Sequence, residues 1–509
     1  MAVNLSRRAL LGAAAASAIG VVAGASGASG STAGSRTNWE ALRRHLDGDL
    51  VLPSDPSYAL AREQSLRQFD QVHPQAVAYC SSEADVRTVL AFAHDHAVHT
   101  VPRSGGHSFG GYSTTPGMIL DVSRLNQVAI DGDHVVLGGG TQLVDALAAL
   151  TPHGLAVAGG LCPTVGVGGF IQGGGIGYQT RKYGLASDRL ISANVVLADR
   201  RIVRASATEN PDLFWALRGN GGGNYGVVTS YTVDPVRRSD IVFYRLVWPW
   251  AAAASLIENW QQWIIDAPDD LASLLLAMNN NPAAPAPQVT VQGAWYSTVE
   301  ELNSLLDELV GLVGVAPVAR GVAAETVHEA MMQAYRCATL TTAQCHRVGT
   351  APDALVPKYN YYRTRCRMFG GAVPTADVDQ LLTVLTQPLQ GGGGQARMLY
   401  FEALGGAANL LARTDTAYVH RTTKMLAGVT ATLSNLDYTD DDTAAAESWL
   451  ADGFGVLDRN SLHESYQNYM DPALTDWRRA YYAENYPRLV RIKRAYDPHQ
   501  FFRFARGIG

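Results

Sequence analysis

The stretch "GLCPTVGVGGFIQGGGIGYQTRKYGLASDRL" (residues 160–190) decides how this chain is interpreted. It holds nine glycines and one cysteine, Cys162. Glycine has no Cβ, so a loop rich in it lets backbone amides approach a ligand closely. The stretch does not fit a strand–GxGxxG–helix unit with an acidic residue about 20 positions later, and the chain has no GxxxxGK[ST] motif. A Rossmann site and a P-loop are therefore unsupported, and a large phosphate-bearing ligand of another kind is expected.

A second glycine-rich stretch, "RSGGHSFGG" (residues 103–111), carries His107, which precedes Cys162 by 55 residues. Taken alone, this stretch is equally well explained as a tight surface turn with an incidental histidine. Two such loops in one segment instead predict a single ligand that contacts both. Imidazole and thiolate are strong nucleophiles at neutral pH, so each loop would bring a nucleophile to that ligand.

The composition excludes several classes of function. Hydrophobic residues make up 47% and charged residues 17% of the 509 residues, which indicates a large buried core. The net charge is −6 and the body has no Lys/Arg stripe, so no nucleic-acid partner is expected. Five cysteines without a CxxC or Cys/His cluster favour neither a disulfide framework nor a metal site, although bridges among Cys337, Cys345 and Cys366 stay open for an exported protein.

The N-terminus is typical of a targeting segment. "LSRRALLGAAAASAIGVVAGASG" (residues 5–27) has paired arginines, a weakly apolar Ala-rich run and a small-residue cleavage site. Residues 1–36 are predicted to be a twin-Arg signal peptide and a flexible leader, and the mature protein to be secreted. The alternative is an N-terminal membrane anchor. No other stretch reaches the roughly 18 apolar residues of a membrane span, so no stable membrane association is expected.

The composition and the predicted secondary structure change at two places along the chain. Residues 37–235 alternate short strands and helices around glycine turns, as in the strand at 76–82 and the helix at 83–97. Residues 236–455 combine longer helical patterns (301–314, 376–389) with strands (289–296, 396–404), and residues 456–509 are rich in aromatic residues and arginine. An α+β fold of two parts is predicted, with a boundary near 235 and another near 455.

Four motifs in this order resemble the berberine-bridge-enzyme-like FAD oxidases of the vanillyl-alcohol-oxidase fold. They are "RSGGHSFGGYS", the stretch 160–190, "NPDLFWALRGNGGGNYGVVTSYTV" (210–233) and "YQNYMDPALTDWRRAYYAENYPRLVRIKRAYDPHQFF" (466–502). The match runs from about residue 40 to the C-terminus. The resemblance implies a two-part PCMH-type FAD-binding domain, formed by 37–235 and by 456–509 returning to it. It also implies a substrate domain at 236–455 with an antiparallel sheet backed by helices.

The resemblance further implies FAD held by two covalent bonds, from His107 to the 8α-methyl carbon and from Cys162 to C6. For Cys162 alone, the alternative is a buried, inert thiol. Val165 matches a position where a small residue leaves room for oxygen, which favours an oxidase over a dehydrogenase. Asp188-Arg189 departs from the Asp-Asn common in the family. The predicted cofactor-binding residues are Arg103, Ser104, Gly105, Gly106, His107, Ser108, Cys162, Val165, Gly166, Gly168, Gly169, Gly173, Gly174, Gly177 and Asn468.

The proton of the substrate must be removed by the protein, because flavin accepts only the hydride. Tyr466 matches the tyrosine over the flavin in related sugar and antibiotic oxidases. In an extended "YQNY" segment, Tyr466 and Asn468 would share one face, with Gln467 and Tyr469 on the other. A phenol titrates near 10, so Tyr466 would need a nearby positive charge or a second tyrosine, Tyr469 or Tyr400, to act as a base.

The substrate side is weakly determined. Seven side chains of the central segment are possible cleft residues: Trp295, Tyr296, Tyr361, Tyr362, Arg363, Tyr400 and His420. The predicted function is oxidation of an alcohol group on a sugar, an oligosaccharide or a glycosylated or polycyclic natural product, with O2 reduced to H2O2. One alternative is a tailoring enzyme that closes a ring or introduces a double bond in secondary metabolism. Another is a flavin-fold protein that binds a ligand without turnover. A Ser/His/Asp hydrolase is unsupported.

Overall fold

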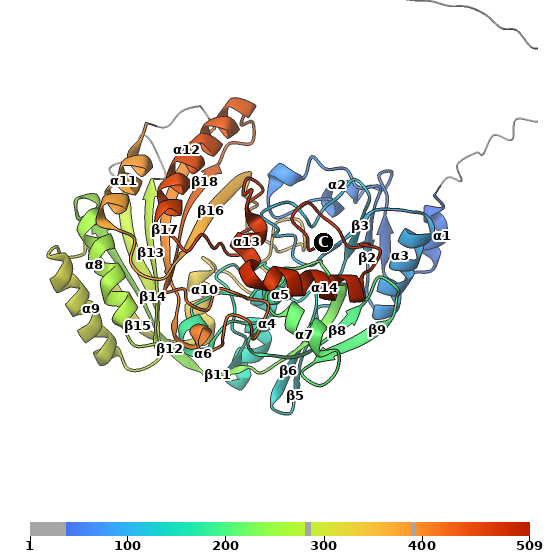
Figure 1. Ribbon diagram of the computed structural model, residues 1–509, viewed down its shortest axis with the longest axis horizontal. Helices are drawn as coiled ribbons and strands as arrows, with labels where there is room; N and C mark the ends of the chain where they lie inside the picture. The colour runs from blue at the N-terminus through green and yellow to red at the C-terminus, as the bar shows by residue number, and fades with distance from the viewer. Residues whose placement is uncertain (1–36, 280–286, 389–392) are drawn as a thin grey trace, which may run out of the picture. The chain divides into compact units, whose positions relative to one another are not determined.

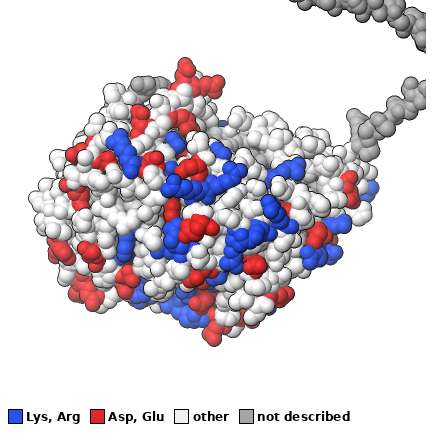
Figure 2. All heavy atoms as spheres, viewed as in Figure 1, with Lys and Arg blue, Asp and Glu red and all other residues white. Residues whose placement is uncertain are grey.

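The computed structural model describes residues 37–279, 287–388 and 393–509 (Figure 1). The predicted signal peptide and leader, residues 1–36, lie outside the described residues, so twin-Arg export stays a prediction. None of the described helices is long and apolar enough to cross a membrane. Positive and negative side chains are interspersed on the face that Figure 2 shows.

The first part of the chain builds two small sheets around its glycine turns. A four-stranded sheet has the order β1(Asp49–Val51), β2(Ala76–Tyr79), β4(Met118–Asp121), β3(Thr100–Arg103), with β2, β4 and β3 parallel. Helix α3(Glu83–Asp95) connects β2 to the chain leading into β3, and the Ser82 side chain caps it by accepting from the Asp85 amide. These elements confirm the strand and helix predicted at 76–97.

The second of these sheets is antiparallel and has five strands. Its order is β5(Val128–Asp131), β6(His134–Gly138), β10(Val227–Val233), β8(Leu190–Val196), β9(Ile202–Ser206). A short pair joins β7(Leu155–Ala156) to β11(Val236–Arg237). The helices of this part and of its connections are α1(Trp39–Arg44), α2(Tyr58–Ala61), α4(Leu143–Leu150), α5(Val167–Gln172), α6(Thr180–Tyr183) and α7(Pro211–Leu217).

A seven-stranded antiparallel sheet forms the central part of the chain. Its order is β15(Ala319–Thr326), β12(Asp240–Pro249), β14(Gln288–Trp295), β13(Leu271–Asn279), β17(Gln395–Ala403), β18(Met425–Leu433), β16(Tyr361–Phe369). Helices α8(Ala253–Asp266), α9(Val299–Val313), α11(Thr375–Thr386) and α12(Asp440–Arg459) cover one face, as Figure 1 shows. Helix α10(Val327–Ala334) follows β15. The predicted antiparallel sheet backed by helices is confirmed.

Strand β17 shows how the two faces of this sheet differ. Leu399 and Phe401 belong to the apolar core under the helices and are almost fully buried. Met398, Tyr400 and Glu402 alternate with them and line a cavity on the opposite face. Successive side chains of a strand point to opposite faces. One short strand therefore serves the core on one side and a pocket on the other.

The C-terminal segment returns to the first part of the chain. Helix α14(Tyr486–Tyr496) lies beside α7 (Figure 1), after the short helix α13(Trp477–Tyr482). The Tyr225 hydroxyl donates to the Leu489 carbonyl at 3.0 Å. Buried Lys493 donates to the Phe502 carbonyl at 2.6 Å and pairs with Asp497 at 2.6 Å. The Tyr225 hydrogen bond, together with one from Lys493 to the Asn224 carbonyl at 2.5 Å, holds the C-terminal segment against the first part of the chain.

The cysteines divide into one bridge and three thiols. Cys337 and Cys345 form a disulfide, while Cys80, Cys162 and Cys366 are free. Of the bridges that the sequence left open, the structure therefore contains the one between the two nearest cysteines. No group of three or more His, Cys, Asp or Glu side chains that could hold a metal ion occurs among the described residues.

One buried ion pair fixes the start of the first glycine loop. Arg103, the last residue of β3, pairs with Asp121, the last residue of the neighbouring β4, and both are at most 5% exposed. Breaking such a pair leaves an uncompensated buried charge. We expect Asp121→Asn to lower the free energy of unfolding by about 3–5 kcal/mol, measured by urea unfolding followed by circular dichroism.

The matched control is Asp131→Asn, which makes the same change on an exposed position of β5. It should change the free energy of unfolding by no more than about 0.5 kcal/mol. Equal unfolding midpoints for the two variants would contradict the role given to this ion pair.

Candidate active site

A cavity of about 440 Å³ lies between the two glycine-rich loops and the uncovered face of the seven-stranded sheet. The loops at 103–109 and 160–170 supply one wall. Strands β13 and β17 supply another, and the C-terminal residues 466–470 a third. Its volume is typical of a ligand or cofactor site. The fold thus brings together residues from all three segments that the sequence distinguishes.

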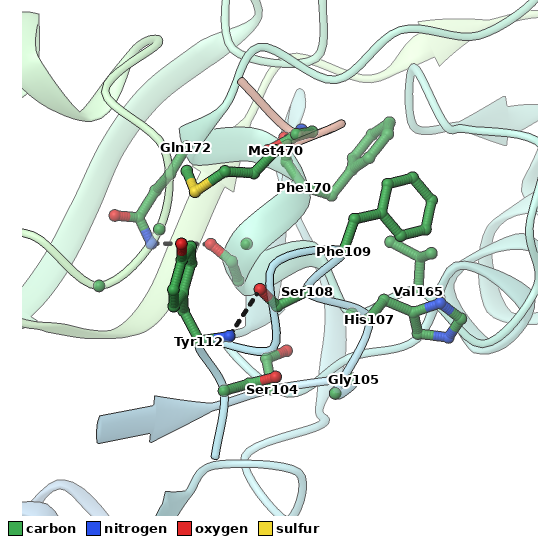
Figure 3. A pocket seen from close by; sticks show the side chains of 18 of the residues that line it. Ser104, Gly105, His107, Ser108, Phe109, Tyr112, Val165, Phe170, Gln172 and Met470 are labelled. Carbon is green, nitrogen blue, oxygen red and sulfur yellow. Dashed lines mark hydrogen bonds between the residues drawn. The ribbon is translucent and has the colours of Figure 1, made fainter. Parts of the chain in front are cut away.

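The two glycine loops touch each other through their backbones. A Cβ on Gly105 would lie 2.4 Å from the Gly166 nitrogen, and one on Gly166 would lie 2.1 Å from the Ser104 hydroxyl oxygen. Figure 3 shows this wall of the pocket, with Ser104, Gly105 and His107 on one loop and Val165 on the other. Any larger residue at Gly105 or Gly166 would force the loops apart.

His107 lies on the cavity wall as a neutral imidazole. The pKa of His107 is lowered to about 4, chiefly by burial and also by the positive charge of Arg347, while a hydrogen bond to the Thr164 backbone opposes the fall. Its Nε2 lies 2.8 Å from the Thr164 hydroxyl oxygen. A neutral ring keeps one nitrogen lone pair free for bond formation at neutral pH.

Cys162 lies on the same wall and is free. Burial raises the pKa of the Cys162 thiol, and hydrogen bonds from Thr164 and from the Val165 backbone oppose that rise. The Cys162 sulfur lies 4.0 Å from the Thr164 hydroxyl oxygen. The thiolate is the reactive form of cysteine, so these donors favour its chemistry.

The residues present fit FAD. Two nucleophiles from separate loops face one cavity, and the loop between Gly166 and Gly169 presents backbone with open space beside Gly169. The predicted residues that line the cavity are Arg103, Ser104, Gly105, Gly106, His107, Ser108, Cys162, Val165, Gly166, Gly168, Gly169 and Asn468. Arg103 does so while its guanidinium is held by Asp121.

Three predicted glycines are not part of the cavity wall. A Cβ on Gly173 would meet the Asn468 amide oxygen at 1.8 Å, and one on Gly177 would meet the Gly159 carbonyl at 1.9 Å. Gly174 has a φ of +113° and packs on the Tyr418 ring. These glycines are needed for the close packing behind the wall, where side chains would not fit.

The "YQNY" segment is a turn and not an extended strand, so the predicted alternation is wrong there. The Tyr469 amide donates to the Tyr466 carbonyl at 2.9 Å, which closes the turn. The rings of Tyr466 and Tyr469 are therefore 5.0 Å apart, and both line the cavity together with Gln467 and Asn468. A tight turn gathers on one side what an extended segment would separate.

Tyr466 is held by three N–H donors. Its hydroxyl oxygen accepts from the Gly175 amide at 2.9 Å, the Ile176 amide at 3.2 Å and the Asn468 side chain at 2.9 Å. Burial raises the pKa of Tyr466, and these three donors oppose the rise. The Tyr400 hydroxyl instead lies 3.1 Å from the Thr364 hydroxyl, and burial raises the pKa of Tyr400.

Glu402 is the functional candidate that the sequence reasoning missed. Its carboxyl lines the cavity, is 9% exposed, and has no hydrogen bond or ion pair among the described residues. Burial raises the pKa of Glu402 from 4.5 to about 7. The sequence "ARMLYFEAL" (396–404) could have indicated it, because the side chains of a strand alternate and Glu402 therefore shares a face with Tyr400. A lone acid opposite the apolar core face of a strand is a candidate for proton transfer.

Of the seven suggested cleft residues, only Tyr362 and Tyr400 line the cavity. Trp295 and Tyr361 pack in the core under the helices. His420 is buried and hydrogen-bonded to Glu464 at 2.7 Å, and Arg363 pairs with Glu447 at 2.8 Å. The remaining one, Tyr296, packs in the core of the first part. Aromatic residues in a core and in a cleft share the same sequence pattern, so the sequence could not separate them.

The unusual Asp188-Arg189 pair has structural partners away from the cavity wall. Asp188 accepts two hydrogen bonds from buried Arg421, at 2.7 and 2.8 Å. Arg189 pairs with Asp234 at 2.5 Å. The two charges therefore connect the second glycine stretch to neighbouring segments.

Comparison with known proteins agrees with the site. A family model described as "FAD binding domain" matches residues 74–206, and one described as "Berberine and berberine like" matches residues 465–509. The uncharacterized FAD-linked oxidoreductase YgaK of Bacillus subtilis (strain 168) is 26% identical over 475 residues, covering 91% of this chain and 97% of the relative. The glucooligosaccharide oxidase of Sarocladium strictum is 28% identical over 453 residues, covering 84% and 86%.

Two solved structures show the same fold. Wild-type BBE-like 1 of Physcomitrella patens superposes with a TM-score of 0.83 at 22% identity, covering 92% of this chain and 98% of that chain. The structure described as "Functional roles of the 6-s-cysteinyl, 8 alpha-N1-histidyl FAD in Glucooligosaccharide Oxidase from Acremonium strictum" gives a TM-score of 0.79 at 23% identity, covering 92% and 98%.

The fold, the cavity and the two family models define an FAD-binding oxidoreductase. The resemblance seen in the four motifs is confirmed: the chain carries an FAD-binding domain and a berberine-like C-terminal segment, and its fold is that of the BBE-like structures.

The raised pKa of Glu402 predicts a pH-dependent signal. A carboxyl whose folded pKa lies above its unfolded value contributes stability below pH 4.5, and that contribution is lost as the pH rises through about 7. We expect infrared difference spectra to show a protonated carboxyl that titrates near pH 7 and is absent from Glu402→Gln. We also expect Glu402→Gln to gain stability relative to the wild type between pH 4.5 and 7. A carboxyl band that titrates near pH 4.5 would contradict the burial argument.

Proposed function

We propose that the protein is an FAD-dependent oxidase that oxidises an alcohol group of a sugar, an oligosaccharide or a glycosylated or polycyclic natural product. The observation that carries this proposal is the shared cavity. Two nucleophiles, His107 and Cys162, line it together with an unpaired carboxyl, Glu402. When bound, FAD would accept the hydride and pass the electrons to O2 as H2O2. The relatedness to a glucooligosaccharide oxidase supports a sugar-type substrate.

A continuous series of aromatic rings supports this class of substrate. Tyr359 contacts Tyr362 at 5.2 Å between ring centroids, Tyr362 stacks on Phe109 at 5.2 Å, and Phe109 contacts Tyr469 at 5.4 Å. All four rings line the cavity. Aromatic faces pack well against the apolar faces of sugars and flat ring systems, so these rings can position such a molecule beside Glu402.

Glu402 is the proton acceptor in this proposal. Burial raises the pKa of Tyr400, Tyr466 and Tyr469, and the charge of Glu402 adds to each rise, because a second negative charge nearby is unfavourable. The cluster therefore takes up a single negative charge as the pH rises through about 7, and Glu402 carries it. Tyr466 and Tyr469 lie beside it and orient the substrate hydroxyl, whose proton ends on the carboxylate as the hydride leaves.

The flavin is held in this proposal by bonds from His107 to the 8α-methyl carbon and from Cys162 to C6. Each of the two side chains would supply the electron pair of its bond to the flavin. O2 would take up the two electrons and two protons released at each tether as one H2O2. Val165, on the wall beside Cys162, supports access of O2. The described histidyl and cysteinyl linkages of a glucooligosaccharide oxidase support this arrangement.

Export by the twin-Arg route completes the proposal. The Cys337–Cys345 disulfide supports an oxidising destination, because disulfides persist outside the reducing cytoplasm. The paired Arg7 and Arg8 support a pathway that carries folded proteins, which suits a chain that gains its flavin before export.

The first test concerns the tethers. We expect acid precipitation of the wild type to leave the yellow chromophore in the pellet. His107→Ala and Cys162→Ala should each retain one linkage, and only the double variant should release FAD, as measured by absorbance and by peptide mass spectrometry. The matched control is Cys366→Ala, which removes a buried thiol that does not line the cavity. This variant should keep both linkages. A colourless wild-type pellet would refute the covalent tethers.

The second test concerns catalysis. With gluco- and xylo-oligosaccharides and glycosylated aromatics as substrates, the wild type should consume O2 and form H2O2. Its kcat/KM should rise with pH to a plateau above about 7. Glu402→Gln should lower kcat by a factor of about 10²–10⁴ and remove that pH step, because the proton acceptor is lost.

Tyr466→Phe is the comparison variant for the second test. It keeps the ring and Glu402, so the pH step should remain. A larger loss in Tyr466→Phe than in Glu402→Gln would assign the proton transfer to the tyrosine. Turnover with an artificial electron acceptor but without peroxide would refute O2 as the acceptor. A ring-closed or desaturated product would point to a tailoring enzyme.

A further inference from the structure

Thr164 lies between the two nucleophiles of the cavity wall. Its hydroxyl oxygen is 2.8 Å from His107 Nε2 and 4.0 Å from the Cys162 sulfur. The residue is 5% exposed, so water does not compete freely for these contacts. One side chain therefore touches both groups proposed to hold the flavin, although the groups are 55 residues apart in the sequence.

The hydroxyl of a threonine can serve the two neighbours in different ways. It has a single hydrogen to donate and oxygen lone pairs to accept. Burial raises the pKa of the Cys162 thiol, and a hydrogen bond from the Thr164 side chain opposes that rise, which is the effect of a donor to the thiolate. Because the hydroxyl has only one hydrogen, donation to the sulfur leaves its oxygen lone pairs to accept from an N–H at His107 Nε2, 2.8 Å away.

We propose that Thr164 is a positioning residue for flavin attachment, and that its hydroxyl accepts from His107 Nε2–H while donating to the Cys162 thiolate. The proton on Nε2 leaves the lone pair on Nδ1, so the ring offers Nδ1 as its nucleophile. The donated hydrogen bond stabilises the thiolate, so the sulfur is available for bond formation. This inference rests on the two covalent tethers proposed above.

The transfer of electrons and protons in the attachment step is consistent with this orientation of the hydroxyl. At His107, Nδ1 supplies the electron pair of the new N–C bond and the flavin methyl group loses one proton. The ring loses its Nε2 proton after the bond has formed, and the hydroxyl that accepts from Nε2 lies on that path. At Cys162, the thiolate supplies the pair of the S–C bond and the C6 hydrogen leaves as a proton. In both cases O2 takes two electrons and two protons as H2O2.

The backbone of this loop is held without the Thr164 hydroxyl, which permits a clean test. The Val144 amide donates to the Pro163 carbonyl at 3.0 Å, and the Leu143 amide donates to the Val165 carbonyl at 3.0 Å. Thr164→Val keeps the shape of the side chain and removes only the hydroxyl. Thr164→Ser keeps the hydroxyl and removes only the methyl group.

The experiment measures linkage and binding separately in the full chain. FAD that stays bound in gel filtration is counted first, and the acid-stable fraction at His107 and at Cys162 is then determined by peptide mass spectrometry over time in air. We expect Thr164→Val to bind FAD yet to link it at least about tenfold more slowly at both residues. Thr164→Ser should link it at close to the wild-type rate.

The pH dependence provides a readout that a merely structural role would not affect. In Thr164→Val, linkage at Cys162 should accelerate by up to about tenfold per pH unit above pH 7, because more thiolate forms. The wild type should accelerate less. Equal linking rates in the wild type and Thr164→Val would overturn the role of Thr164, as would loss of FAD binding in both variants. A wild type without any acid-stable flavin would overturn the tethers themselves, and this inference with them.

Discussion

The contact between two backbones, at Gly105 and Gly166, is the constraint on which the rest of the site depends. Because neither residue has a side chain, the loops at 103–111 and 160–177 meet at a distance that any Cβ would prevent. That approach places His107 against Thr164 and on the same wall as Cys162. The buried pair of Arg103 and Asp121 fixes the point at which the first loop leaves its strand. His107 and Cys162 therefore share one wall because Gly105 and Gly166 have no side chains.

The second constraint is burial, which disfavours the charged forms of the ionisable groups in the cavity. The cavity joins a wall of backbone and neutral nucleophiles to a group of aromatic rings with one carboxyl. The same burial that keeps His107 neutral moves the pKa of Glu402 toward neutral pH. Burial acts in opposite directions on an imidazole and a carboxyl, since in both it disfavours the charged form. One physical cause thus keeps the His107 imidazole neutral and brings the pKa of the Glu402 carboxyl close to neutral pH.

Much of the fold, and of the cavity wall formed by the two glycine loops, could be predicted from the sequence, because glycine-rich loops and strand periodicity are local signals. The strand at 76–79 and the helix at 83–95 follow from such patterns, and the antiparallel sheet of the central segment was expected from the family resemblance. Glu402 was missed because its importance comes from facing Tyr466 and Tyr469, which lie on a distant segment. The turn at 466–469 was missed because it contains no glycine or proline to mark it. The glycines at 173 and 177 lie outside the cavity wall, where close contacts with Asn468 and with the Gly159 carbonyl leave no room for a side chain.

The two-faced strand β17 has a consequence for how such an enzyme can change. Leu399 and Phe401 anchor the sheet to its helices, while Met398, Tyr400 and Glu402 line the cavity. Replacement of a ligand-facing residue leaves the interlocked core untouched, so its effect on folding is small compared with its effect on the reaction. Cavity-facing positions of β13 and β17 can therefore be replaced with less effect on the core than the positions between them. The two faces of one strand thus separate the residues that contact with a substrate would require from those that folding requires.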